Sequence, residues 1–111
     1  MNKSKFCIVF WVFFTALTLD RFAMAEQHAN EALRHATEAA ASQGDSKAVG
    51  EHAGEALKHI EAAKATNPDL AKKLGKSEAD LNSAVEHAKR YNTDSAGKDA
   101  KDAKTHIEQI R

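Results

Sequence analysis

Apolar residues, most of them alanine, recur at intervals of three and four along the chain after residue 25. In the first such stretch they are Ala29, Ala32, Leu33, Ala36 and Ala40, with polar and charged residues between them. This spacing places them on one face of an α-helix, whereas no segment shows the period of two that is typical of a strand. The pattern therefore predicts an all-α protein.

Polar residues that cap or end helices divide this pattern into four segments. Gly44 suits the left-handed residue that follows many helices, and Asp45 or Ser46 can cap the next one. Asn67-Pro68-Asp69 favours a helix start, because asparagine caps and proline fits the first turn. Asn92-Thr93-Asp94 separates the last two segments. We predict helices over about residues 26–41, 46–65, 68–91 and 94–110.

Helices of this length joined by short loops favour antiparallel neighbours. The expected fold is an up-down antiparallel four-helix bundle over residues 26–111. Glycine lowers helix propensity, so a break in the third helix at Gly75, with a fresh capping start at Ser77, is an alternative.

The first 25 residues have the three parts of a secretory signal peptide. Lys3 and Lys5 give a positive start, residues 6–19 an apolar run, and Ala23-Met24-Ala25 a small-x-small cleavage pattern. The apolar run is shorter than the roughly 20 residues that a membrane-spanning helix needs. We predict cleavage after Ala25 and a periplasmic or secreted protein that leaves the membrane. The alternative is an uncleaved membrane anchor.

Loss of the signal peptide would remove every cysteine, methionine, phenylalanine and tryptophan. Residues 26–111 hold 13 basic and 15 acidic side chains, so they lack the excess of positive charge that is typical of nucleic-acid binding. Without cysteine, a metal ion must be bound by nitrogen and oxygen ligands. The few large apolar residues predict a thin core, and they leave a homodimer open: Leu33, Val49, Leu57, Ile60, Leu70, Leu74, Leu81, Val85, Tyr91, Ile107 and Ile110.

All six histidines fall within an eight-residue repeat. The copy His28-Ala29-Asn30-Glu31-Ala32-Leu33-Arg34-His35 closely matches residues 52–59. Residues 80–87 and 99–106 are weaker copies, in which aspartate replaces the first histidine. The repeat indicates that one helix or one helical hairpin has been duplicated.

Each of the first two copies carries a glutamate between its histidines. Glu31 lies three residues after His28 and four before His35, and the copy over 52–59 repeats this arrangement. Histidines seven residues apart are separated by about 10.5 Å along the axis, too far to bind one ion. Spacings of three and four bring side chains together, so each helix presents a His–Glu–His stripe.

Folding the chain at the predicted loops brings the stripes of neighbouring helices to the same level. The centres of the two hairpins are expected near Gln43-Gly44 and Asn92-Thr93. The pairs then expected at one level are His35 with His52, His28 with His59, His87 with Asp99, and Asp80 with His106. Two helices can thus supply the imidazoles and carboxylates that one helix cannot.

Imidazole and carboxylate ligands favour Cu(II), Ni(II) or Zn(II), and copper generally binds most tightly. The stripes lie on the flank of the apolar face, where partial exposure suits reversible binding. We therefore expect extracytoplasmic binding of divalent metal for buffering or sequestration. The expected ligands are His28, Glu31, His35, His52, Glu55 and His59, with Asp80, His87, Asp99 and His106 as weaker ones.

The stretches from His28 to Ala40 and from His52 to Ala63 resemble the small metal-binding protein family, as does Val85-Glu86-His87-Ala88-Lys89. With the signal peptide, the resemblance covers essentially the whole chain. It implies an exported four-helix bundle of short histidine-bearing repeats that binds several divalent metals, copper included. The six histidines match motif positions, whereas Asp80 and Asp99 depart from them.

Enzymatic function is not expected. The sequence contains no nucleophile elbow, Gly-rich phosphate loop, HExxH or CxxCH motif, and a polar helix flank lacks the desolvated cleft typical of catalysis. The alternative to metal binding is a non-catalytic helical interaction or stress-protection module. The Ala/Lys/Asp/Gly composition of residues 95–104 is the feature that favours it.

Overall fold

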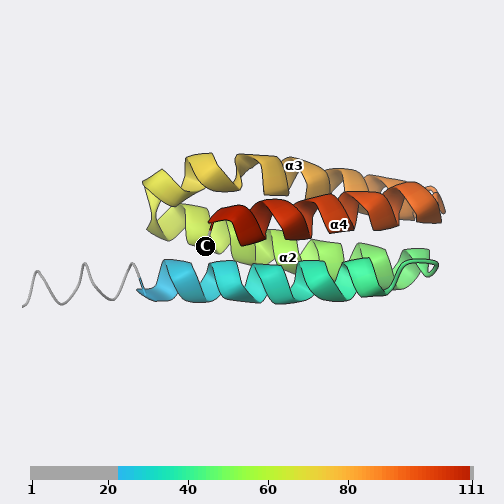
Figure 1. Cartoon of the computed structure of the whole chain (residues 1–111), viewed down its shortest axis with the longest axis horizontal. Coiled ribbons are helices and arrows are strands. Elements are labelled where there is room, and N and C mark those ends of the chain that lie inside the picture. The colour runs from blue at the N-terminus through green and yellow to red at the C-terminus, as the bar shows by residue number, and fades with distance from the viewer. Residues whose placement is uncertain (1–22, 111) are drawn as a thin grey trace, which may run out of the picture.

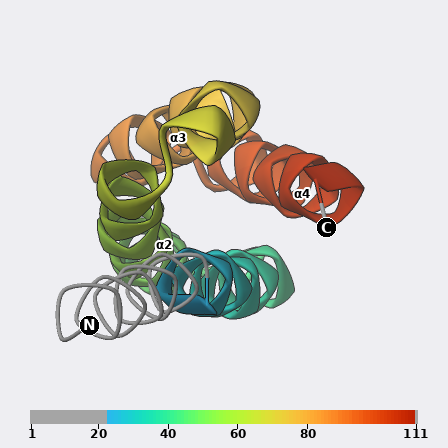
Figure 2. The ribbon, with the colours of Figure 1, turned by 90° about the vertical axis from the view of Figure 1, so that its left-hand side faces the viewer.

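The computed structural model describes residues 23–110, and within this range the chain is helical with no strand. A first helix over residues 23–41 is followed by α2 (Ser46–Thr66), α3 (Pro68–Lys89) and α4 (Thr93–Ile110). Successive helices run in opposite directions and lie next to each other around a common axis (Figure 1, Figure 2). The arrangement is compatible with the predicted up-down four-helix bundle. We call the first helix with α2 the first hairpin, and α3 with α4 the second hairpin.

Most of the predicted signal peptide, residues 1–22, lies outside the described residues. Residues 23–25, which carry the predicted cleavage pattern, are helical and continue into the rest of the first helix. Within residues 23–110, no helix combines the length and apolar character needed to cross a bilayer.

The predicted caps explain where α2 and α3 begin. The Asp45 side chain accepts a hydrogen bond from the Ala48 amide at 3.1 Å, so Asp45 rather than Ser46 caps α2. Gly44, just before it, has φ of 105°, a left-handed conformation that favours glycine. At α3, the Asn67 side chain accepts from the amides of Asp69 and Leu70, with Pro68 in the first turn.

The end of α3 differs from the sequence-based expectation. The helix stops at Lys89 and turns through Tyr91, whose φ of 58° is left-handed. The Tyr91 amide donates to the carbonyl of Ala88, and the Asn92 amide donates to that of His87, which is the Schellman pattern. Tyr91 therefore leaves the bundle with 85% of its surface exposed and adds nothing to the core.

Gly75 does not interrupt α3, which runs unbroken from Pro68 to Lys89. The propensity cost of one glycine is about 1 kcal/mol. Packing outweighs it, because Leu74, Ser77 and Leu81 lie on either side of Gly75 and are fully buried.

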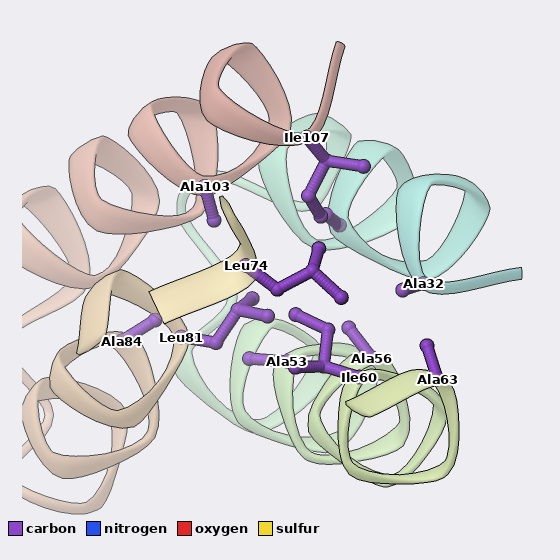
Figure 3. Close-up of a cluster of buried hydrophobic side chains, with 11 residues drawn as sticks. Ala32, Ala53, Ala56, Ile60, Ala63, Leu74, Leu81, Ala84, Ala103 and Ile107 are labelled. Atoms are coloured by element: carbon purple, nitrogen blue, oxygen red, sulfur yellow. The ribbon is translucent and has the colours of Figure 1, made fainter. Parts of the chain in front are cut away.

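The core is a seam of small residues at alternating spacings of three and four, the pattern of coiled-coil-like packing. Over residues 23–110, thirteen of the eighteen buried hydrophobic residues are alanine, which lets the helices approach closely. Large buried side chains come from α2, α3 and α4, and Figure 3 shows them meeting Ala32 of the first helix. The fully buried large aliphatic residues are Val49, Ile60, Leu74, Leu81 and Ile107. Alanine buries little apolar area, so such a core is modestly stable.

Candidate metal centre

Four histidines lie along the interface between the first helix and α2. The Nδ1 atoms of His28 and His59 are 3.1 Å apart. The His35 ring centroid lies 6.1 Å from that of His52 and 5.5 Å from that of His59. All four residues are half-buried. The pairs His28–His59 and His35–His52 are those that the hairpin register predicts. His35 also lies close to His59.

His28 and His59 are in direct contact. Two nitrogens at this distance form a hydrogen bond in which one donates and the other accepts. Burial, followed by the positive charges that His28 and His35 can carry, lowers the pKa of His59. His59 is therefore neutral at pH 7, and neutral imidazole is the form that binds a metal ion.

Two sets of three side chains in the first hairpin can each surround one ion. Glu31, His35 and His59 form one set, and within it the ligand atoms lie within 4.8 Å of one another. His35, Glu38 and His52 form the second set by the same measure. His35 belongs to both, and only 14% of its side chain is exposed. The first hairpin thus offers two overlapping sites around one shared imidazole.

Glu38 was not among the ligands expected from the sequence. It lies three residues after His35 but outside the eight-residue repeat that directed attention to Glu31. Its carboxylate reaches across to α2, where its Oε2 is 3.0 Å from Nδ1 of His52. The signal available in the sequence was the spacing of three from His35, the same kind of spacing that relates Glu31 to His28.

Glu55 is not brought into either set. Its carboxylate accepts a hydrogen bond from Lys58 Nζ at 3.1 Å, and this hydrogen bond is the main reason why its pKa is lowered. His28 also stands outside both sets, in contact with His59. The duplicated sequence therefore does not produce a symmetric site. Each glutamate pairs with the basic residue three positions on, but only Glu31 joins a set of possible metal ligands.

Arg34 contacts both carboxylates that contribute to the sets. Its Nη2 donates to Glu31 Oε2 at 3.0 Å, and its Nη1 donates to Glu38 Oε1 at 2.7 Å. The hydrogen bond from Arg34 is the main cause of the lowered pKa of Glu31. Both carboxylates are therefore already paired with a cation.

The second hairpin pairs its histidines with aspartates, at the predicted levels. His87 Nδ1 lies 2.6 Å from Asp99 Oδ2, and His106 Nδ1 lies 2.6 Å from Asp80 Oδ2. Each pair links α3 to α4. Within residues 23–110, neither pair is joined by a third metal-ligating side chain. Each ring can still present its Nε2 atom to an ion, with the aspartate orienting it from the other side.

The fold and the site define a class: a small helical protein that gathers imidazoles and carboxylates along one helical hairpin. The chain belongs to the small metal-binding protein family, whose sequence profile matches residues 3–110, nearly the whole length. No curated protein matches the chain. Family membership implies that the protein binds metal ions, and the family is not known for catalysis.

Proposed function

We propose that the protein reversibly binds divalent metal ions through the first hairpin and serves to buffer or sequester them outside the cytoplasm. The observation that carries this proposal is the pair of overlapping sets around His35, each with two imidazoles and one carboxylate. Such ligands suit Cu(II), Ni(II) and Zn(II), with Cu(II) expected to bind most tightly. Three protein ligands leave positions open for water, as is typical of exchangeable rather than structural sites.

The sharing of His35 limits how many ions the first hairpin can hold. A neutral imidazole has one nitrogen with a free lone pair, because the other nitrogen carries the proton. His35 can therefore bind one ion at a time, either with Glu31 and His59 or with Glu38 and His52. We infer one tightly bound ion in the first hairpin, and weaker binding at the histidine–aspartate pairs of the second.

Calorimetric titration of the purified protein with Cu(II), Ni(II) and Zn(II) at pH 7.5 tests this proposal. We expect one tight equivalent per chain, with Cu(II) bound most strongly. The matched control is a variant in which all six histidines are replaced by alanine, and it should show no tight equivalent. An identical response from the protein and this control would overturn the proposal and favour a helical module that does not bind metal.

We further propose that the chain is exported, loses residues 1–25 and acts in the periplasm or outside the cell. The support is the sequence pattern of a positive start, an apolar run and Ala23-Met24-Ala25. N-terminal sequencing of the protein from the extracytoplasmic fraction should begin at Glu26. A full-length chain recovered with the membrane would instead support an uncleaved anchor. The proposed partners are metal ions, with a second copy of the chain as an open alternative.

A further inference from the structure

The groups that would bind an ion are already paired with a positive charge in the structure. Besides its bonds to Glu31 and Glu38, the Arg34 guanidinium has Nη2 at 3.2 Å from His35 Nε2. A guanidinium only donates hydrogen bonds, so Nε2 of His35 must be the nitrogen that accepts. Arg34 thus engages the shared imidazole and the carboxylate of each set.

We propose that Arg34 is an internal competitor of the metal ion: its guanidinium pairs with the ligand groups and must move away before an ion can bind. This inference rests on the proposed function and adds a residue that lowers the affinity of the first hairpin for the ion. The competition is direct in the set of Glu31, His35 and His59, because Arg34 contacts both the Glu31 carboxylate and Nε2 of His35. In the other set, Arg34 pairs with Glu38 Oε1 and the Oε2 atom faces His52, so the guanidinium shares this carboxylate with the ion.

The position of Arg34 allows this displacement. The Arg34 side chain is 53% exposed, so it can move into solvent without disturbing the core. Glu31 and Glu38 are also partly exposed, at 40% and 37%. Exposed ion pairs are weak individually, so an ion held by several ligands can displace them. The guanidinium then lowers metal affinity without preventing binding.

Lys58 provides a matched comparison within the same chain. It occupies the repeat position in α2 that Arg34 occupies in the first helix. Among the residues that the structure describes, Lys58 pairs with Glu55 alone, and Glu55 belongs to neither set. Replacing either residue by glutamine removes one positive charge from the same hairpin, but only Arg34→Gln frees groups that would bind the ion.

The test is calorimetric titration of the wild-type protein, Arg34→Gln, Lys58→Gln and Arg34→Lys with Zn(II) at pH 7.5. Arg34→Gln should bind roughly three- to tenfold more tightly than wild type, whereas Lys58→Gln should differ by less than about twofold. Arg34→Lys should lie between wild type and Arg34→Gln, because an ammonium cannot bridge two carboxylates with a planar fork. Circular dichroism of each variant should show unchanged helix content.

A spectroscopic measurement on the wild-type protein follows the arginine itself. The Arg34 Nε–H group donates to Glu31 Oε2 at 3.1 Å, so its nitrogen–proton resonance should shift as Zn(II) is added. Equal affinities for Arg34→Gln and Lys58→Gln, or weaker binding by Arg34→Gln, would overturn the role of Arg34 and leave the proposed function standing. Absence of Zn(II) binding in all four proteins would instead overturn the proposed function.

Discussion

Replacing His35 with alanine will weaken metal binding by at least about 100-fold. Loss of a group that merely orients a ligand commonly costs 10- to 100-fold in metal affinity, and loss of the ligand itself should cost at least as much. His35 is the one histidine that belongs to both sets, so its removal leaves neither set with more than one imidazole. No other single histidine of the first hairpin has this property.

The control variants follow from the same geometry. His52→Ala leaves Glu31, His35 and His59 in place, and His59→Ala leaves His35, Glu38 and His52. Each should keep one bound ion and lose roughly tenfold or less in affinity. His87→Ala, in the second hairpin, should leave the tight equivalent unchanged. Calorimetric titration with Cu(II) or Ni(II) measures all four variants. Losses of equal size from His35→Ala and His87→Ala would contradict a site in the first hairpin.

Saturation with Cu(II) or Ni(II) at pH 7.5 will stabilise the protein strongly. A ligand at 100 times its Kd that binds only the folded state adds about 2.7 kcal/mol to the free energy of unfolding. For a domain of this size, that increase corresponds to a rise in Tm of about 10 to 20 °C. The effect should be easy to observe, because a core built largely of alanine gives the metal-free protein little stability of its own.

The same measurement repeated at lower pH should lose most of this increase. Ligand histidines must be neutral to bind, so protonation near pH 5 releases the ion. The metal-free protein should also become less stable. The folded-state pKa of His59 lies below its usual value of about 6.5, so the unfolded chain binds more protons once the pH falls below that value. The free energy of unfolding therefore decreases as the pH falls.

Thermal denaturation followed by circular dichroism, with and without metal at pH 7.5 and pH 5, tests this pair of expectations. The His35→Ala variant serves as the control, and its Tm should barely respond to metal at either pH. A metal-dependent rise in Tm that is as large at pH 5 as at pH 7.5 would contradict ligation by histidine. It would point instead to binding by carboxylates alone.

The register of both hairpins could be predicted from the sequence because short loops fix it. Once the turn is centred near Gln43-Gly44, counting residues places His28 level with His59. The same counting from Asn92-Thr93 places His87 level with Asp99. The all-helical fold was equally accessible, since spacings of three and four recur along residues 26–110.

The rotation of the helices and the choice of partners could not be predicted from the sequence. Spacing shows that Glu31, Glu38 and Glu55 lie near histidines, but it does not show which of them face the neighbouring helix. That choice depends on the orientation that buries the alanines, and on competition with Arg34 and Lys58 for the carboxylates. The same limit applies to Tyr91, because a left-handed tyrosine is an uncommon way to end a helix.

The histidine–aspartate pairs give the two halves of the molecule different dependences on metal. In the second hairpin, each imidazole already has a negatively charged neighbour within the chain, so α3 and α4 are linked whether or not metal is present. In the first hairpin the two helices are linked by the His28–His59 contact and the Glu38–His52 pair, and an ion bound at His35 would add further bonds between them. A change in metal supply should therefore alter the stability of the first hairpin more than that of the second.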